Sequence, residues 1–150
     1  MSSYDEDMAA IYLKNNIRSG MLGVDEIEKL ISDKKEKITL ISKVYPQKDG
    51  NDPIEFYQLE KKQQIEAVAW VLETFRPIKN INASNTSYGY KHMFEWFHNG
   101  FYMNNGEMKG AFLIAGFNCN NPYEINWCFN VSKSDVKRLS ELKNRTWEYR

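Results

Sequence analysis

Residues 85–117 read NTSYGYKHMFEWFHNGFYMNNGEMKGAFLIAGF, and they hold the two helices that decide the predicted fold. The first helix covers residues 88–97, and one of three polar residues can cap its N-terminus: Asn85, Thr86 or Ser87. Gly89 weakens its first turn, because glycine loses more backbone freedom on folding than any other residue. The polar residues 98–100 (HNG) then end it.

A second helix is predicted to begin after Asn104, since Glu107 stands three residues later as in a capping box. Gly116 closes this helix, and Gly110 offers a small contact point on one of its faces. Between the two helices, residues 101–103 (FYM) favour a short extended stretch.

The C-terminal residues predict one strand and one further helix. Residues 124–131 (EINWCFNV) alternate in polarity as a strand does. Ser132, followed by Asp135 three positions later, is typical of a helix start. This last helix turns a basic face outward, made of Lys133, Lys137, Arg138 and Lys143.

The first half of the chain is mostly helical by its pattern. Residues 5–21 and 24–44 each repeat apolar side chains at helical spacing. The turn-rich residues 46–53 (PQKDGNDP) predict a linker. A helix over residues 55–75 and a short extended segment over residues 78–83 follow.

The predicted fold is mainly α with a small β element, an α+β class. An N-terminal helical segment, residues 1–45, precedes a helix-loop-helix-strand-helix C-terminal unit. We assign residues 54–150 to an aromatic-rich C-terminal domain joined to that segment by the linker over residues 46–53. The sequence leaves open whether the two parts pack as one domain.

The overall composition excludes several classes of protein. An apolar fraction of 42%, with 14% aromatic residues, excludes a disordered chain. The 20 basic and 20 acidic side chains balance, so there is no global field to hold nucleic acid or an anionic membrane. The N-terminus, MSSYDEDMAA, is acidic, unlike a signal peptide, and no run of about 18 apolar residues is present. We expect a cytoplasmic protein with no membrane partner.

Aromatic residues are concentrated between residues 88 and 102, where seven occur. They form either a core alone or a core with an exposed binding face, since aromatic side chains anchor interfaces and stack on unpaired bases. Candidate partner-binding residues are Tyr90, Lys91, His92, Trp96 and Tyr102, together with the basic face at Lys133, Lys137 and Arg138. The alternative role for His92 is a hydrogen-bonded helix residue that ties down the following loop.

No pattern of catalytic or metal-binding residues stands out. The residues of metal-ligand type are His92, His98, Cys119 and Cys128, and their spacing matches no zinc finger or ribbon. Nothing pairs a base with either cysteine, and no glycine-rich phosphate loop occurs. We predict no cofactor, no metal and no enzymatic activity.

Four short strings resemble a group of small uncharacterised proteins encoded by bacteriophages and plasmids. These are SYGYKH (residues 87–92), NNGEMKGA (residues 104–111), AGF (residues 115–117) and FNVS (residues 129–132). The resemblance covers about residues 85–136 and brings no catalytic residue with it. It implies a mobile element inside a bacterial cell.

Two functions follow as hypotheses. The first is a phage-type interaction protein that binds and inhibits a host nucleic-acid-handling or defence factor, as anti-CRISPR proteins do by analogy. Its partner would be a host protein or a protein–nucleic-acid complex. The alternative is a DNA-binding transcriptional regulator that uses the C-terminal helices. The oligomeric state is open.

Overall fold

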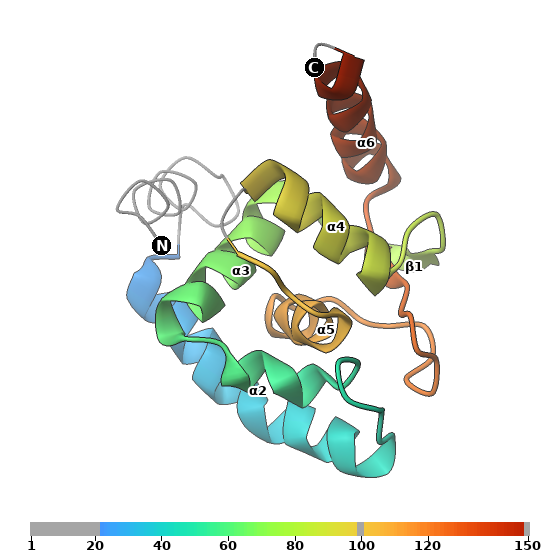
Figure 1. Ribbon diagram of the computed structural model, residues 1–150. Coiled ribbons are helices and arrows are strands. Elements are labelled where there is room, and N and C mark those ends of the chain that lie inside the picture. Colours follow the sequence, from blue (N-terminus) through green and yellow to red (C-terminus); the bar gives the residue numbers. More distant parts are fainter. Residues whose placement is uncertain (1–21, 99–100, 149–150) are drawn as a thin grey trace.

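The computed structural model describes residues 22–98 and 101–148 of the chain. The helix predicted over residues 5–21 lies outside the described residues. The elements of the fold are drawn in Figure 1.

Helix α5 (Asn105–Ile114) lies in the middle of the molecule, surrounded by other helices (Figure 1). All of its residues except Glu107 are buried. The Asn104 side chain accepts a hydrogen bond from the Glu107 amide at 2.7 Å, and the Glu107 carboxylate accepts one from the Asn104 amide at 2.8 Å. The predicted capping box is therefore confirmed, as is the stop at Gly116, where φ is +100°.

The 3₁₀ helix η1 (Pro53–Gln58) packs against α5 along Gly106 and Gly110. A Cβ atom on Gly106 would lie 2.3 Å from the carbonyl oxygen of Asp52. A Cβ atom on Gly110 would lie 2.5 Å from the Cβ of Phe56. The two elements thus meet backbone to backbone, which confirms Gly110 as a small contact point.

The single helix predicted over residues 55–75 is wrong. The structure has η1 followed by α3 (Lys61–Thr74), with Leu59 in an extended conformation between them. The Asp52 side chain caps η1 by accepting a hydrogen bond from a backbone amide of its first turn at 3.0 Å, and Pro53 occupies that turn. A helical turn therefore starts inside the predicted linker and has ended before α3 begins.

Helix α2 (Val24–Val44) confirms the helix predicted over the same residues. It buries Ile27, Ile31 and Ile38 in the same apolar cluster as α3 and α5. The Tyr57 hydroxyl donates to the Ile31 carbonyl at 2.6 Å, and burial raises the pKa of Tyr57 to about 12. The helix before the predicted linker and the elements after it therefore share one core.

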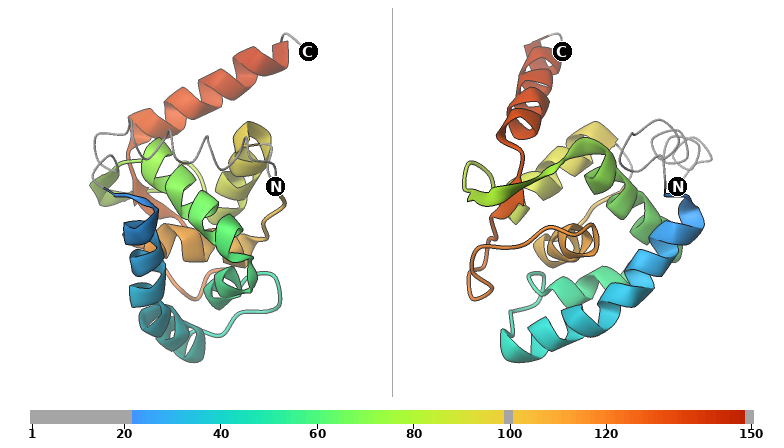
Figure 2. Two further views of the ribbon diagram at one scale, coloured as in Figure 1. Left: turned by 90° about the vertical axis from the view of Figure 1, so that its left-hand side faces the viewer. Right: turned by 180° about the vertical axis from the view of Figure 1, so that it is seen from behind.

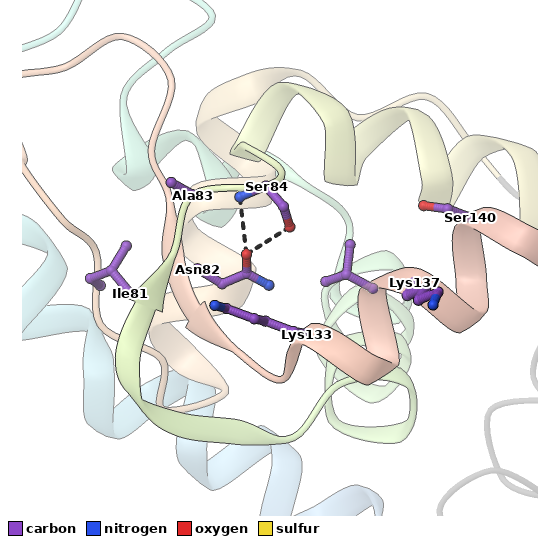
Figure 3. A pocket seen from close by; sticks show the side chains of 8 residues that line it. Ile81, Asn82, Ala83, Ser84, Lys133, Lys137 and Ser140 are labelled. Atoms are coloured by element: carbon purple, nitrogen blue, oxygen red, sulfur yellow. Dashed lines mark hydrogen bonds between the residues drawn. The ribbon is translucent and has the colours of Figure 1, made fainter.

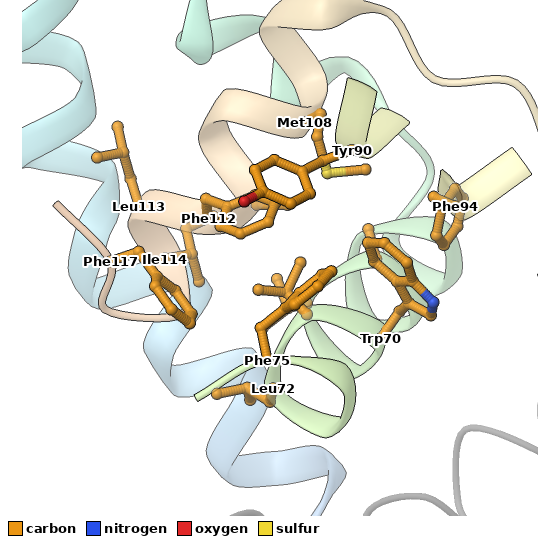
Figure 4. Close-up of a cluster of buried hydrophobic side chains, with 14 of the residues drawn as sticks. Trp70, Leu72, Phe75, Tyr90, Phe94, Met108, Phe112, Leu113, Ile114 and Phe117 are labelled. Carbon is orange, nitrogen blue, oxygen red and sulfur yellow. The ribbon is translucent and has the colours of Figure 1, made fainter. Parts of the chain in front are cut away.

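Aromatic rings from several elements pack against one another in the core (Figure 4). The Tyr90 ring, on helix α4 (Ser87–His98), lies 4.8 Å from the Phe112 ring of α5 and 5.2 Å from the Phe75 ring. Phe112 also stacks on Phe129 with ring centroids 4.5 Å apart. Such contacts stabilise aromatic pairs by about 0.5–1.5 kcal/mol beyond the area that they bury.

Helix α4 confirms the helix predicted over residues 88–97. Among the three predicted caps, Thr86 supplies the hydroxyl, because its Oγ1 accepts a hydrogen bond from the Gly89 amide at 3.4 Å. Ser87 instead ties α4 to a distant loop: its hydroxyl accepts from the Trp127 amide at 3.0 Å, and its amide donates to the Trp127 carbonyl at 2.7 Å.

Strands β1 (Pro77–Asn82) and β2 (Phe129–Val131) pair antiparallel in a two-stranded sheet. β1 confirms the extended segment predicted over residues 78–83. The strand predicted over residues 124–131 is only partly right, because a turn precedes its last three residues. Residues 101–103, predicted to be extended, belong to no strand of the described structure.

Helix α6 (Lys133–Glu148) projects from the rest of the molecule (Figure 2). The Ser132 hydroxyl accepts a hydrogen bond from the Asp135 amide at 3.4 Å, which confirms the predicted helix start. Val136 and Leu139 are buried and attach the first turns of α6 to the body. The helices and the small sheet together confirm the predicted mainly α, α+β class.

Candidate interaction surfaces

Tyr90, which the sequence places among the candidate partner-binding residues, is buried. Its side chain is 0% exposed, because the ring fills the core between Phe75 and Phe112 (Figure 4). Burial also raises the pKa of the Tyr90 hydroxyl, as expected for a phenol removed from water. Tyr90 therefore supports the fold and does not reach a partner.

Lys91 is also buried, at 5% exposure, although the sequence places it among the contact residues. Its ammonium group lies 3.0 Å from the Glu95 carboxylate. It also lies 4.6 Å from the centre of the Tyr102 ring and 5.5 Å from that of Tyr88. Lys91 thus holds two tyrosine rings in place by ion–quadrupole attraction and is not free to bind a partner itself.

Tyr88, Lys91, His92, Glu95 and Tyr102 together make a surface that we call the tyrosine face. Tyr88 is 51% exposed and Tyr102 is 68% exposed. The His92 ring meets the Tyr88 ring edge to face at 4.5 Å, and its Nδ1 lies 3.6 Å from a Glu95 oxygen. Two large rings are therefore fixed on one side and open to solvent on the other.

The tyrosine face brings together three of the predicted residues, Lys91, His92 and Tyr102. Sequence reasoning missed Tyr88 as a contact, although its spacing of four from His92 places both on one helix face. Trp96 lies outside this group: it is half-buried and already interacts with neighbouring residues.

The predicted basic face at the start of α6 is divided in two by the fold. Lys133 and Lys137 are exposed and line an open groove between α6 and the turn that follows β1 (Figure 3). Arg138 instead donates to the Thr74 carbonyl at 3.4 Å and lies 3.7 Å from the Asp135 carboxylate. Two lysines therefore face the groove, while the arginine joins α6 to the end of α3.

This groove, which we call the basic groove, has a volume of about 650 Å³. Its remaining lining is Ile81, Asn82, Ala83, Ser84, Val136 and Ser140. The Asn82 side-chain oxygen accepts hydrogen bonds from the Ser84 amide at 3.0 Å and hydroxyl at 2.6 Å, which fix the turn. A rigid turn thus forms one wall and α6 forms the other.

Asp135 is buried beneath the start of α6 and fastens that helix to the body. Its carboxylate accepts hydrogen bonds from the Arg76 amide at 2.9 Å and from the guanidinium at 3.1 Å. Burial alone would raise the pKa of Asp135, but the Arg76 hydrogen bonds and the charges of Arg76 and Arg138 hold that pKa below its ordinary value. Stability from this carboxylate is therefore present at neutral pH and is lost as the pH falls through its lowered pKa.

Replacing Asp135 with alanine should loosen α6 and lower the melting temperature at neutral pH. We expect a drop of about 3–6 °C, because the Arg76 amide and guanidinium lose a shared acceptor. Differential scanning calorimetry measures this change in melting temperature. Glu141→Ala, an exposed acidic position on the same helix, makes the same charge change and is expected to shift the melting temperature by less than about 1 °C. Equal shifts for the two variants would contradict the role of Asp135.

Lys109 is fully buried on α5, a position that sequence reasoning did not single out. Its ammonium group donates to the Asn51 carbonyl at 2.8 Å and lies 4.6 Å from the centre of the Trp127 ring. Burial lowers the pKa of Lys109 to about 8, against smaller opposing effects from Asp52, Cys119 and Glu55. Through these contacts Lys109 holds the Asn51 carbonyl and the Trp127 ring against α5.

The two cysteines are both free thiols. Burial raises the pKa of Cys119 and of Cys128, and for Cys128 the charge of Glu124 adds to the effect. Since the thiolate is the nucleophilic form, neither side chain is activated for attack at neutral pH.

No family model, curated protein or solved structure matches the chain. Within residues 22–98 and 101–148, no helix is long and apolar enough to cross a membrane. The same residues contain no cluster of three His, Cys, Asp or Glu side chains that could hold a metal ion.

Proposed function

We propose that the protein is a non-catalytic interaction protein of a mobile element. It acts in the cytoplasm of a bacterial host, where it binds and inhibits a nucleic-acid-handling or defence factor, in the manner of an anti-CRISPR protein. The observation that carries this proposal is the tyrosine face: Tyr88 and Tyr102 are exposed, yet both are held by the buried Lys91.

Exposed aromatic rings supply much contact area for little loss of conformational freedom, which is why tyrosine is frequent among residues that dominate binding energy. The Tyr88 and Tyr102 rings are already partly ordered before a partner binds, because the Lys91 ammonium lies against both of them. Preorganisation of this kind lowers the entropic cost of association. His92 and Glu95 add a polar edge to the same surface.

The charge of the molecule limits the mode of inhibition. A protein that filled a nucleic-acid channel by resembling nucleic acid would need a strongly acidic surface. This chain has no net charge, and its groove beside α6 is lined by two lysines. Binding through a tyrosine-rich patch to a complementary surface of the host factor agrees better with these charges.

The proposal is tested by capture from a bacterial lysate with the tagged chain, followed by titration of the captured factor. A Tyr88→Ala/Tyr102→Ala variant should bind that factor about tenfold more weakly or worse, since both anchors are removed. Tyr123→Ala is the matched control, because Tyr123 is 73% exposed and lies outside the tyrosine face. Unchanged affinity in the double variant, or an equal loss in the control, would contradict the proposal.

A second candidate is a DNA-binding transcriptional regulator that uses α6. Its support is the projection of α6 from the body with Lys133 and Lys137 exposed near its start (Figure 2). The balanced charge of the chain argues against it, because duplex binders usually carry a strong excess of positive charge.

A further inference from the structure

The basic groove differs from an ordinary charged surface because its cations are unpaired and part of its lining is apolar. In the described part of the chain, neither Lys133 nor Lys137 has a carboxylate within ion-pair distance. They stand one helical turn apart on α6, and both line the groove (Figure 3). Ile81 on β1 and Val136 on α6 are the large apolar residues of the lining.

The two arginines next to the groove already make contacts within the protein. Arg76 gives its amide and its guanidinium to Asp135, and Arg138 lies between Asp135 and the Thr74 carbonyl. Arginine has a forked geometry that pairs with carboxylate and phosphate alike, whereas lysine acts as a point charge. The cations left for a ligand are thus two lysines, which can contact phosphate oxygens without a fixed geometry.

We propose that the basic groove binds the backbone of a single-stranded nucleic acid. Lys133 and Lys137 contact neighbouring phosphates, while the sugars lie against the apolar side chains of Ile81 and Val136 in the lining. This inference rests on the proposed function and deepens it: within the host complex, the tyrosine face meets protein and the groove meets that complex's nucleic-acid strand.

The geometry favours a single strand over a duplex. In Figure 3 the Lys133 side chain lies back across the groove toward Asn82, so it points between the two walls. A helix that reads a duplex must instead present its side chains outward into a groove about 12 Å wide. A groove of about 650 Å³ bounded by the turn after β1 accommodates a few nucleotides of one strand.

The experiment is fluorescence anisotropy with labelled oligonucleotides of about 12 nucleotides, as single-stranded DNA, single-stranded RNA and duplex. With two phosphate contacts, the logarithm of the affinity for a single strand should fall with the logarithm of salt at a slope of about −1.4. Raising salt fourfold, from about 50 mM to about 200 mM, should then weaken binding about sevenfold. The DNA and RNA arms show which strand the groove prefers.

A Lys133→Ala/Lys137→Ala variant should bind at least about tenfold more weakly at the lower salt and lose most of the salt slope. Both lysines are exposed, so the variant should keep the wild-type melting temperature. Lys29→Ala/Lys43→Ala is the matched control, since it removes the same charge from exposed positions on α2 and should change affinity less than about twofold.

The inference and the proposed function can fail separately. Absence of binding to every oligonucleotide up to about 100 µM protein, with capture still dependent on Tyr88 and Tyr102, would overturn the groove assignment alone. Suppose that oligonucleotide binding is lost in the Lys133→Ala/Lys137→Ala variant, while the Tyr88→Ala/Tyr102→Ala variant captures the host factor as well as wild type does. That result would overturn the tyrosine face as the docking surface and leave the groove assignment intact. Tighter binding to duplex than to either single strand would overturn the single-strand inference and favour the regulator.

Discussion

Replacement of Gly106 or Gly110 by alanine is expected to lower the free energy of unfolding by about 3 kcal/mol. The added Cβ on Gly106 would lie 2.3 Å from the carbonyl oxygen and 2.6 Å from the amide nitrogen of Asp52. The one on Gly110 would lie 2.6 Å from the carbonyl oxygen of Pro53. Because the opposing atoms are backbone, no rotamer change relieves the clash, and η1 must move away from α5.

The sign of this result is informative, because helix propensity alone predicts the opposite. Alanine within a helix is favoured over glycine by about 1 kcal/mol, so an unhindered substitution would stabilise the chain. Urea denaturation of each variant against wild type measures the difference. Gly23→Ala is the control, since Gly23 is exposed before α2 and the new Cβ would lie 3.7 Å from its nearest neighbour, an oxygen of the Glu26 carboxylate. Variants at positions 106 and 110 as stable as wild type would contradict close packing of η1 on α5.

Local signals in the sequence were sufficient for most of the helices. The apolar spacing in residues 24–44 and the pairing of Asn104 with Glu107 depend only on neighbours along the chain, and both predictions are confirmed. The failure over residues 55–75 has a physical reason. Asp52 and Pro53 start a short 3₁₀ helix that packs on α5, a contact that the apolar spacing of residues 55–75 does not contain.

The candidate surfaces were harder to predict, because aromatic side chains occur on several faces of α4. Tyr88 and Tyr90 are two positions apart on a helix, so they point in very different directions, and only the packing partners decide which is inward. Tyr90 meets Phe75 and Phe112, rings from two other helices or their ends. The burial of Lys91 could not be predicted from the sequence of α4 either, since it depends on Tyr102, a residue beyond the end of that helix.

Lys109→Met is expected to change how stability depends on pH. In the unfolded chain a lysine has its ordinary pKa of 10.5, whereas burial lowers the pKa of Lys109 in the folded protein to about 8. Between these values the unfolded state binds more protons than the folded state, so raising the pH favours folding. Wild type should therefore gain about 2.5 kcal/mol relative to Lys109→Met between about pH 7 and about pH 10.

The comparison must be a difference between two proteins, because other buried groups act in the opposite direction. Burial raises the pKa of Cys119 and that of Tyr57, so both hold protons longer in the folded state and reduce stability as the pH rises. Wild type and Lys109→Met share Tyr57, whose contribution cancels, but the Lys109 charge lowers the pKa of Cys119, so both proteins are compared in a Cys119→Ala background. Urea unfolding at several pH values gives the difference, and Lys48→Met, at an exposed loop position, gives the baseline for removing a lysine.

The difference in the free energy of unfolding between wild type and Lys109→Met at neutral pH has a separate origin from its change with pH. Lys109→Met loses the hydrogen bond to the Asn51 carbonyl and the contact with the Trp127 ring, but it also relieves the cost of a buried charge. That difference at neutral pH can have either sign, whereas the pH-dependent part has a required direction. A difference that stays flat from about pH 7 to about pH 10 would mean that water reaches Lys109 and that the loop at Asn51 is not closed over it.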